Sequence, residues 1–154
     1  MLYGLLAAAV IAADQLVKHA TVQRLALGET APLLPPLVEL KYVQNTGAAW
    51  SSFAGQRLLL IVLPVVLIAA VLYLVKKYRV RHAVGRLAAA LIAAGGIGNL
   101  IDRIRFGYVV DMFHLLFLPS YPVFNVADIA VVLGAALAAL YYLRLYEKYD
   151  AAQK

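Results

Sequence analysis

The chain has 154 residues, of which 64% are hydrophobic and 14% charged, and its formal net charge is +6. Soluble domains typically have about 45–50% apolar and about 25% charged residues, so a soluble fold of this length would leave much apolar surface in water. The absence of cysteine excludes disulfides, thiolate catalysis and cysteine-ligated metals. The basic residues lie beside apolar runs and form no stripe with aromatic residues, so no nucleic-acid partner is expected.

Four apolar segments are long enough, or nearly so, to cross a membrane, at about residues 2–22, 58–75, 84–104 and 126–143. No basic residue precedes the first segment, and Asp14 and Lys18 interrupt it. We therefore predict a retained membrane helix there and not a cleaved signal sequence. The pattern predicts an all-α polytopic membrane protein with four transmembrane helices, forming a single membrane domain over residues 1–154.

The distribution of basic residues predicts the orientation. The connection between the second and third segments and the stretch after the fourth contain eight: Lys76, Lys77, Arg79, Arg81, Arg86, Arg144, Lys148 and Lys154. The remaining connections contain five: Arg24, Lys41, Arg57, Arg103 and Arg105. Because cytoplasmic loops carry an excess of Lys and Arg, we predict that both termini are cytoplasmic and that residues 25–56 and 105–122 are extracytoplasmic.

The first extracytoplasmic segment has a strand-like pattern. Residues 38–42 alternate between apolar and charged side chains, which is the period of a half-buried strand. We expect a small β-sheet element in this segment, resting on the membrane surface. The second extracytoplasmic segment is too short to cross the membrane, and its apolar residues 115–118 are typical of an interfacial stretch.

Several polar residues converge on the outer side under this topology. Charged residues within membrane helices are costly and usually mark function. The convergent residues come from the first, third and fourth helices and the second outer segment: Asp14, Lys18, Asn99, Asp102, Arg103, Asp111, Asn125 and Asp128.

Elimination leaves carboxylates as the candidate catalytic groups. None of the three serines lies in a G-x-S-x-G motif, and H-E-x-x-H is absent, so serine and zinc mechanisms are disfavoured and no metal or cofactor is expected. Two aspartates that share one proton can provide a base that activates water and an acid that hydrogen-bonds a carbonyl oxygen. The candidates are Asp14, Asp102, Asp111 and Asp128.

Each of these polar motifs also has a purely structural interpretation. Asn125 and Asp128 have the spacing of a capping box at a helix start. Asp14 and Lys18, spaced i,i+4, fit a neutralising pair within the bilayer, and Asp102 fits a plain helix end. The small residues 95–98 are typical of close helix packing.

Five ordered blocks resemble one known family. They are Asp14-Gln15 with Lys18, the run Asn-Thr-Gly-Ala-Ala-Trp at 45–50, Gly-Gly-Ile-Gly-Asn-Leu-Ile-Asp-Arg at 95–103, Val-Val-Asp at 109–111, and Phe-Asn-Val-Ala-Asp at 124–128. In this order and spacing the chain is similar to lipoprotein signal peptidase, or signal peptidase II, a family of bacterial intramembrane aspartyl peptidases. It differs from the family's pattern at Met112, where Phe is expected after the aspartate.

The resemblance implies a catalytic pair, Asp111 and Asp128. It implies support or substrate binding by seven residues: Asp14, Lys18, Asn45, Gly47, Asn99, Arg103 and Asn125. The implied substrate is a diacylglyceryl-modified prolipoprotein, cut on the N-terminal side of its lipidated cysteine, at a site near the outer leaflet of the bacterial inner membrane. We expect membrane lipids as the other partners and a monomeric protein.

Two other functions compete with this one. The intramembrane residues Asp14, Lys18 and Asn99 fit a proton relay in a proton-coupled transporter, although the sequence shows no repeat of the kind that such transporters contain. A non-catalytic membrane scaffold is the second alternative.

Overall fold

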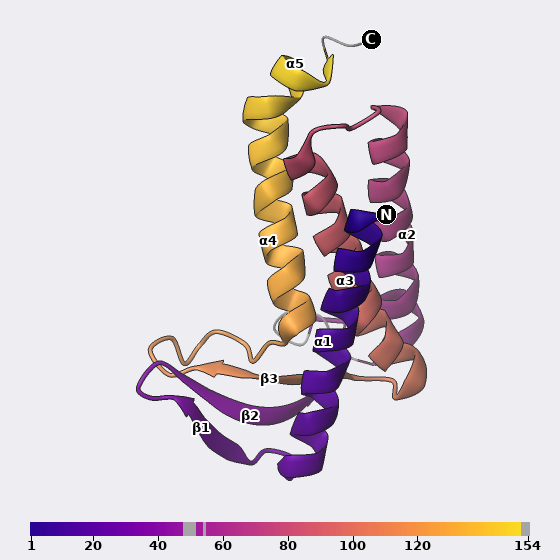
Figure 1. The fold of residues 1–154 in the computed structure, drawn as a ribbon. Helices are drawn as coiled ribbons and strands as arrows, with labels where there is room; N and C mark the ends of the chain where they lie inside the picture. Colours follow the sequence, from indigo (N-terminus) through magenta and orange to yellow (C-terminus); the bar gives the residue numbers. More distant parts are fainter. Residues whose placement is uncertain (48–51, 54, 152–154) are drawn as a thin grey trace.

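The computed structural model describes residues 1–47, 52–53 and 55–151. Its elements, in chain order, are α1 (Leu2–Arg24), β1 (Thr30–Leu34), β2 (Val38–Asn45), α2 (Arg57–Lys77), α3 (Ala83–Arg105), β3 (Val109–Leu115) and α4 (Val126–Leu140). A π-helical turn, η2 (Tyr141–Leu145), and the short α5 (Tyr146–Tyr149) continue α4. Figure 1 shows a helix bundle with a three-stranded sheet at one end.

The predicted fold class is confirmed. Among the described residues, four helices are long and apolar enough to cross a membrane, and the last of them runs from Val126 to Tyr149. Helix α2 is apolar on all sides and buries only Leu60, a composition that suits contact with lipid and not with water.

Helix α3 is the centre of the bundle, because α1, α2 and α4 all pack against it. Small residues allow this close approach. A Cβ added to Gly95 would lie 2.3 Å from the carbonyl oxygen of Ala127 on α4, and one added to Gly134 would lie 2.9 Å from that of Ala88 on α3. The packing interpretation of the glycines at 95–98 therefore fits the structure, since small residues let helix backbones meet in membranes.

The sheet is antiparallel in the order β1-β2-β3. The predicted strand is β2, whereas residues 105–122, expected to be an interfacial stretch, contribute β3. Val43 pairs with Asp111 and Asn45 pairs with Val109, so Asn45 and Asp111 are diagonal neighbours on one face. Met112, where the sequence departs from the family's pattern, is fully buried.

The chain turns sharply from α3 into β3. Gly107 has a φ of +84°, a conformation that glycine adopts without strain at helix ends. Arg57, the first residue of α2, donates to the carbonyl oxygens of Arg103 and Ile104 at 3.2 and 2.8 Å and caps the last turn of α3. These contacts fix the helix end that carries Asp102 and Arg103.

The motif Asn-Thr-Gly-Ala-Ala-Trp at residues 45–50 is described only in part, because residues 48–50 lie outside the described residues.

Candidate active site

Asp111 on β3 and Asp128 on α4 are joined through a single residue, Asn125. The Asn125 amide nitrogen donates to Asp111 Oδ1 at 2.6 Å. Asn125 also exchanges two hydrogen bonds with Asp128: the Asn125 backbone N–H donates to Asp128 Oδ2 at 3.1 Å, and the Asp128 N–H donates to Asn125 Oδ1 at 2.9 Å. Asn125 is completely buried, so it holds the two carboxyl groups together in a water-poor setting.

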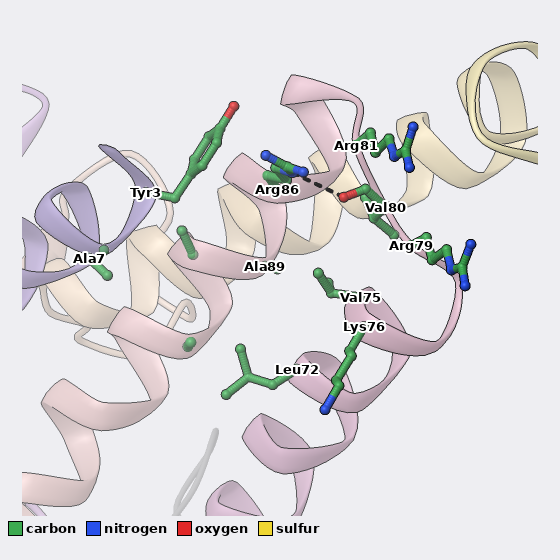
Figure 2. Close-up of a pocket in the computed structure, with 13 residues that line it drawn as sticks. Tyr3, Ala7, Leu72, Val75, Lys76, Arg79, Val80, Arg81, Arg86 and Ala89 are labelled. Carbon is green, nitrogen blue, oxygen red and sulfur yellow. Dashed lines mark hydrogen bonds between the residues drawn. The ribbon is translucent and has the colours of Figure 1, made fainter. Parts of the chain in front are cut away.

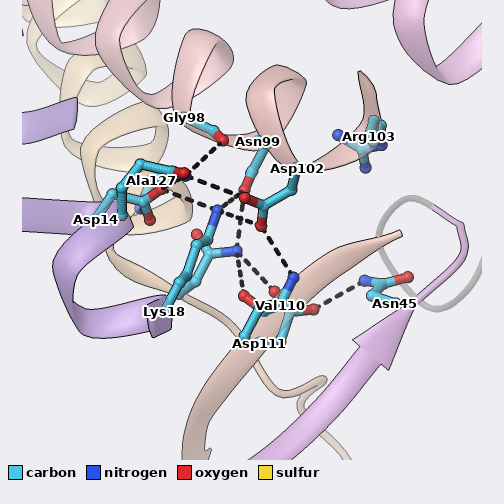
Figure 3. A network of polar contacts seen from close by, with 12 residues as sticks. Asp14, Lys18, Asn45, Gly98, Asn99, Asp102, Arg103, Val110, Asp111 and Ala127 are labelled. Atoms are coloured by element: carbon cyan, nitrogen blue, oxygen red, sulfur yellow. Dashed lines mark hydrogen bonds and ion pairs between the residues drawn. The ribbon is translucent and has the colours of Figure 1, made fainter. Parts of the chain in front are cut away.

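Asp111 is itself only 2% exposed. Its second oxygen, Oδ2, accepts from the Asn45 side chain at 3.0 Å, across the strand pair described above (Figure 3). Burial, and then the negative charge of nearby Asp128, raise the pKa of Asp111 to about 7, although hydrogen bonds from Asn45 and Asn125 and the charge of Lys18 act in the opposite direction. A carboxyl group with such a pKa is half protonated near neutral pH, as an acid or base in catalysis requires.

Asp128 occupies the first turn of α4. The reciprocal bonds with Asn125 form the predicted capping box, and the helix dipole favours negative charge at this position. Asp128 Oδ1 additionally accepts from the Asn99 side chain at 2.7 Å. The cap and the candidate site are therefore the same group of atoms, and the structural and functional interpretations are compatible.

Lys18 supplies the positive charge of this region and is only 3% exposed. Its ammonium lies 2.9 Å from Asp14 Oδ2 and 3.0 Å from Asp102 Oδ2, which gives the predicted i,i+4 pair a second acidic partner. Lys18 also donates to Asn99 Oδ1 at 2.9 Å. Because an amide has one oxygen and one nitrogen, this contact leaves the Asn99 nitrogen to face Asp128.

Asp14 and Asp102 anchor neighbouring backbones as well. Asp14 Oδ1 accepts from the Ala127 N–H at 2.9 Å, and Asp102 Oδ2 accepts from the Val110 N–H at 3.1 Å. Each aspartate thus holds the backbone next to one member of the candidate pair. Gln15, which belongs to the first family motif, donates to Asp102 Oδ1 at 3.0 Å. No local sequence pattern indicates this contact, because it joins two helices.

Arg103 and Gly47 close the other side of the site. Arg103 Nη2 donates to the Gly47 carbonyl at 2.9 Å, and the Gly47 N–H donates to Asn45 Oδ1 at 3.0 Å. Arg103 Nε is buried and has no hydrogen-bond partner among the described residues.

The structure brings all nine predicted site residues together. One continuous chain of hydrogen bonds and ion pairs connects them in the order Asp14, Lys18, Asn99, Asp128, Asn125, Asp111, Asn45, Gly47 and Arg103. Within the part of the chain that the structure describes, no three His, Asp or Glu side chains group as metal ligands would.

Comparison with known proteins identifies the family. A family profile described as signal peptidase (SPase) II matches residues 6–144. The chain is 40% identical over 151 residues to a lipoprotein signal peptidase of Enterococcus faecalis, covering 96% of this chain and 91% of the relative. It is 46% identical over 132 residues to that of Halothermothrix orenii, covering 86% and 88%. The chain belongs to the signal peptidase II family.

Solved structures agree with this assignment. A bacterial membrane enzyme solved by the in meso method matches with a TM-score of 0.86 at 27% identity, covering 94% of this chain and 88% of that one. A second such structure matches with a TM-score of 0.84, also at 27% identity, covering 92% of each chain. The chain is thus a multi-pass membrane protein of a peptidase family, and this membership disfavours the transporter and scaffold alternatives.

Proposed function

We propose that this protein removes signal peptides from diacylglyceryl-modified prolipoproteins, with Asp111 and Asp128 as an aspartyl catalytic pair. The observation that carries the proposal is the bridge through Asn125, which hydrogen-bonds both the buried Asp111 on β3 and the half-buried Asp128 on α4. Buried carboxylates close to one another share a proton, because both cannot be ionised at low cost. The printed names of the relatives, lipoprotein signal peptidase, support the substrate class.

The surroundings of the two aspartates favour different protonation states. Asp128 sits at the positive end of the α4 dipole and accepts from a backbone N–H, so we assign it as the ionised base. Asp111 accepts only side-chain amide hydrogen bonds among the described residues, and its pKa is raised to about 7, so we assign it as the acid. Asp128 then takes a proton from a water molecule as the water oxygen bonds to the scissile carbonyl carbon. Asp111 donates a hydrogen bond to the carbonyl oxygen. As the C–N bond breaks, Asp128 gives the proton that it took from water to the departing amine nitrogen, and Asp128 is ionised again.

Arg103 is suited to a role in substrate binding. Its Nε has no hydrogen-bond partner among the residues that the structure describes, and it can donate to a carbonyl or ester oxygen of the lipid-bearing substrate. Cleavage on the N-terminal side of the lipidated cysteine would place the diacylglyceryl group on the product that remains in the membrane, next to the site. The buried network around Lys18 supports this arrangement by fixing Asn99 and the backbones that carry Asp111 and Asp128.

The test compares wild type with Asp111→Asn and Asp128→Asn in detergent, on a diacylglyceryl-modified prolipoprotein with EDTA present. Each substitution should lower the cleavage rate by about 10²- to 10⁴-fold, the range for loss of a general acid or base. Exposed Glu147 provides the matched control, and Glu147→Gln should keep wild-type activity. Full activity in either aspartate variant would exclude the pair.

The pH profile of the wild-type enzyme is a second test. Its cleavage rate should fall as pH rises through about 7, because Asp111 loses its proton. A flat profile would contradict the acid role of Asp111.

We also propose that both termini face the cytoplasm and that the aspartates lie near the outer leaflet of the inner membrane. The excess of basic residues at the end of the bundle opposite the sheet supports this orientation. Because the chain lacks cysteine, a Ser120→Cys variant has a single thiol. An impermeant maleimide should label it from outside intact spheroplasts, and labelling only after lysis would reverse the topology.

A further inference from the structure

A groove opens between α1, α2 and α3 at the end of the bundle opposite the aspartates (Figure 2). Its volume is about 620 Å³. Figure 1 shows why space remains here: α1 begins nearer the middle of the bundle than the turn that joins α2 and α3. Both α1 and α2 pack against α3, and the groove lies between them.

The floor and walls of the groove are apolar and made largely of small residues. Gly4 and Ala7 of α1 face Ala90 and Ala93 of α3, with Leu72 of α2 on the far wall. A Cβ added to Gly4 would meet nothing within 4 Å, in contrast to the tightly packed glycines of α3. The groove therefore offers an apolar surface of small side chains, between helices that acyl chains surround in a bilayer.

The mouth of the groove carries positive charge. Of the described residues that line it, four are basic and none is acidic: Lys76, Arg79, Arg81 and Arg86. All four side chains are exposed, and Figure 2 shows Arg79 and Arg81 on the turn between α2 and α3, with Lys76 on α2 and Arg86 on α3. Arg86 is held there by its bond to the Val80 carbonyl at 3.0 Å, which engages one of the five N–H donors of its guanidinium.

We propose that this groove binds an anionic glycerophospholipid, with its phosphate among the four cations and one acyl chain along the small residues of α1 and α3. Both halves of the ligand are matched: basic pockets between transmembrane helices bind anionic head groups, and the apolar channel holds a chain. A zwitterionic lipid matches the channel equally well, but its quaternary ammonium would be repelled by the rim. The basic leader of a signal peptide would be repelled for the same reason.

The lipid would fill the space between α1 and α2 and join the first turn of α1 to the rest of the bundle. Helix α1 carries Asp14 and Lys18 towards its other end, so the lipid would stabilise the helix that organises the polar network. This proposal does not depend on the proposed chemistry, because lipid binding is measured without any peptide substrate.

Native mass spectrometry of the full chain in non-ionic detergent provides the test, with dioleoylphosphatidylglycerol and dioleoylphosphatidylcholine as probes. Wild type should retain phosphatidylglycerol in preference. Lys76→Gln with Arg79→Gln should lower the apparent affinity roughly 10- to 30-fold, since each cation near a membrane surface contributes about fivefold. The matched control, Arg144→Gln with Lys148→Gln, removes two exposed cations from the continuation of α4 outside the groove and should change affinity by less than about twofold.

A second pair of variants tests the channel itself. Gly4→Phe places a ring in the open groove and should abolish retention of phosphatidylglycerol, whereas Ala9→Phe, at an exposed α1 position outside the groove, should not. Equal retention of the two lipids by wild type would overturn the proposal and indicate a site for apolar molecules without charge preference. Equal losses in the two charge variants would indicate a diffuse surface potential, and would overturn it too.

Discussion

At one end of the helix bundle acidic and basic side chains are buried and bonded to one another, whereas at the other end four exposed basic side chains line an apolar groove. Lys18 meets two aspartates within 3.0 Å, while the four cations of the groove are exposed. A buried charge costs free energy unless it is paired and hydrogen-bonded. The paired Lys18 network therefore holds its side chains in fixed positions. The second arrangement leaves its charged groups exposed beside the groove. The two ends therefore suit chemistry and lipid binding respectively.

Two buried aspartates make this comparison testable by pH. Asp111 has a pKa raised to about 7 by burial and by Asp128. Burial would also raise the pKa of Asp150, at the other end, but hydrogen bonds from Tyr141 and from the backbone N–H groups of His82 and Arg81 outweigh it and lower that pKa. One aspartate is thus held in a state that retains its proton, and the other in a state that has lost it.

The largest expected effect is on the pH dependence of stability. A raised pKa gives stability that is present below the unfolded value of 3.8 and lost as pH rises through about 7. Between pH 5 and pH 8, Asp111 should therefore lower the free energy of unfolding by about 2–3 kcal/mol. Asp111→Asn should remove most of this decline, as measured by unfolding in detergent at the two pH values.

Asp150→Asn is the matched control for that experiment. Its lowered pKa gives stability present above the unfolded value and lost only as pH falls further. This variant should be less stable than wild type at both pH values and should keep the decline between pH 5 and pH 8. A decline of equal size in the Asp111→Asn variant would show that Asp111 does not carry the raised pKa.

The four membrane helices could be predicted from the sequence, whereas strand β3 could not. The four helices follow from length and composition, because lipid imposes a strong and local requirement on each segment. Strand β3 was missed because residues 109–112 are all buried, so one face is not distinguished from the other and the period of two is absent. The interfacial prediction rested instead on the apolar residues 115–118, which overlap β3 only at Leu115.

The site was predictable where residues lie in ordered motifs and not where contacts cross between elements. The resemblance to the family implied nine site residues, and the structure links them through hydrogen bonds and ion pairs. The contact of Gln15 with Asp102 and the cap that Arg57 places on α3 depend on how the helices meet. The groove could not be predicted either. A basic run beside apolar helices looks the same in the sequence whether it only sets the membrane orientation or also binds a ligand.

A smaller expected effect concerns packing at the two ends. Gly95→Ala would bring a methyl group to 2.3 Å from the Ala127 carbonyl oxygen and 2.7 Å from a Val131 methyl group. The backbone of α4 would have to move away from α3, at a cost of about 1–3 kcal/mol, as is typical of an overpacked core. Thermal unfolding in detergent should show a lower midpoint. Because the displaced backbone leads directly to Asp128, the cleavage rate should fall with it.

Gly4→Ala is the counterpart at the open end and should have the smallest effect, with the opposite sign. The added methyl group meets nothing within 4 Å, and alanine loses less backbone entropy than glycine when a helix forms. Since Gly4 lies in the first turn of α1, where fewer backbone bonds are at stake, the gain should be about 0.5 kcal/mol or less. A methyl group is too small to fill the groove, so phosphatidylglycerol retention should persist in Gly4→Ala although it is lost in Gly4→Phe. A destabilisation by Gly4→Ala as large as that by Gly95→Ala would show that the groove is closed, and would remove the contrast between the two ends.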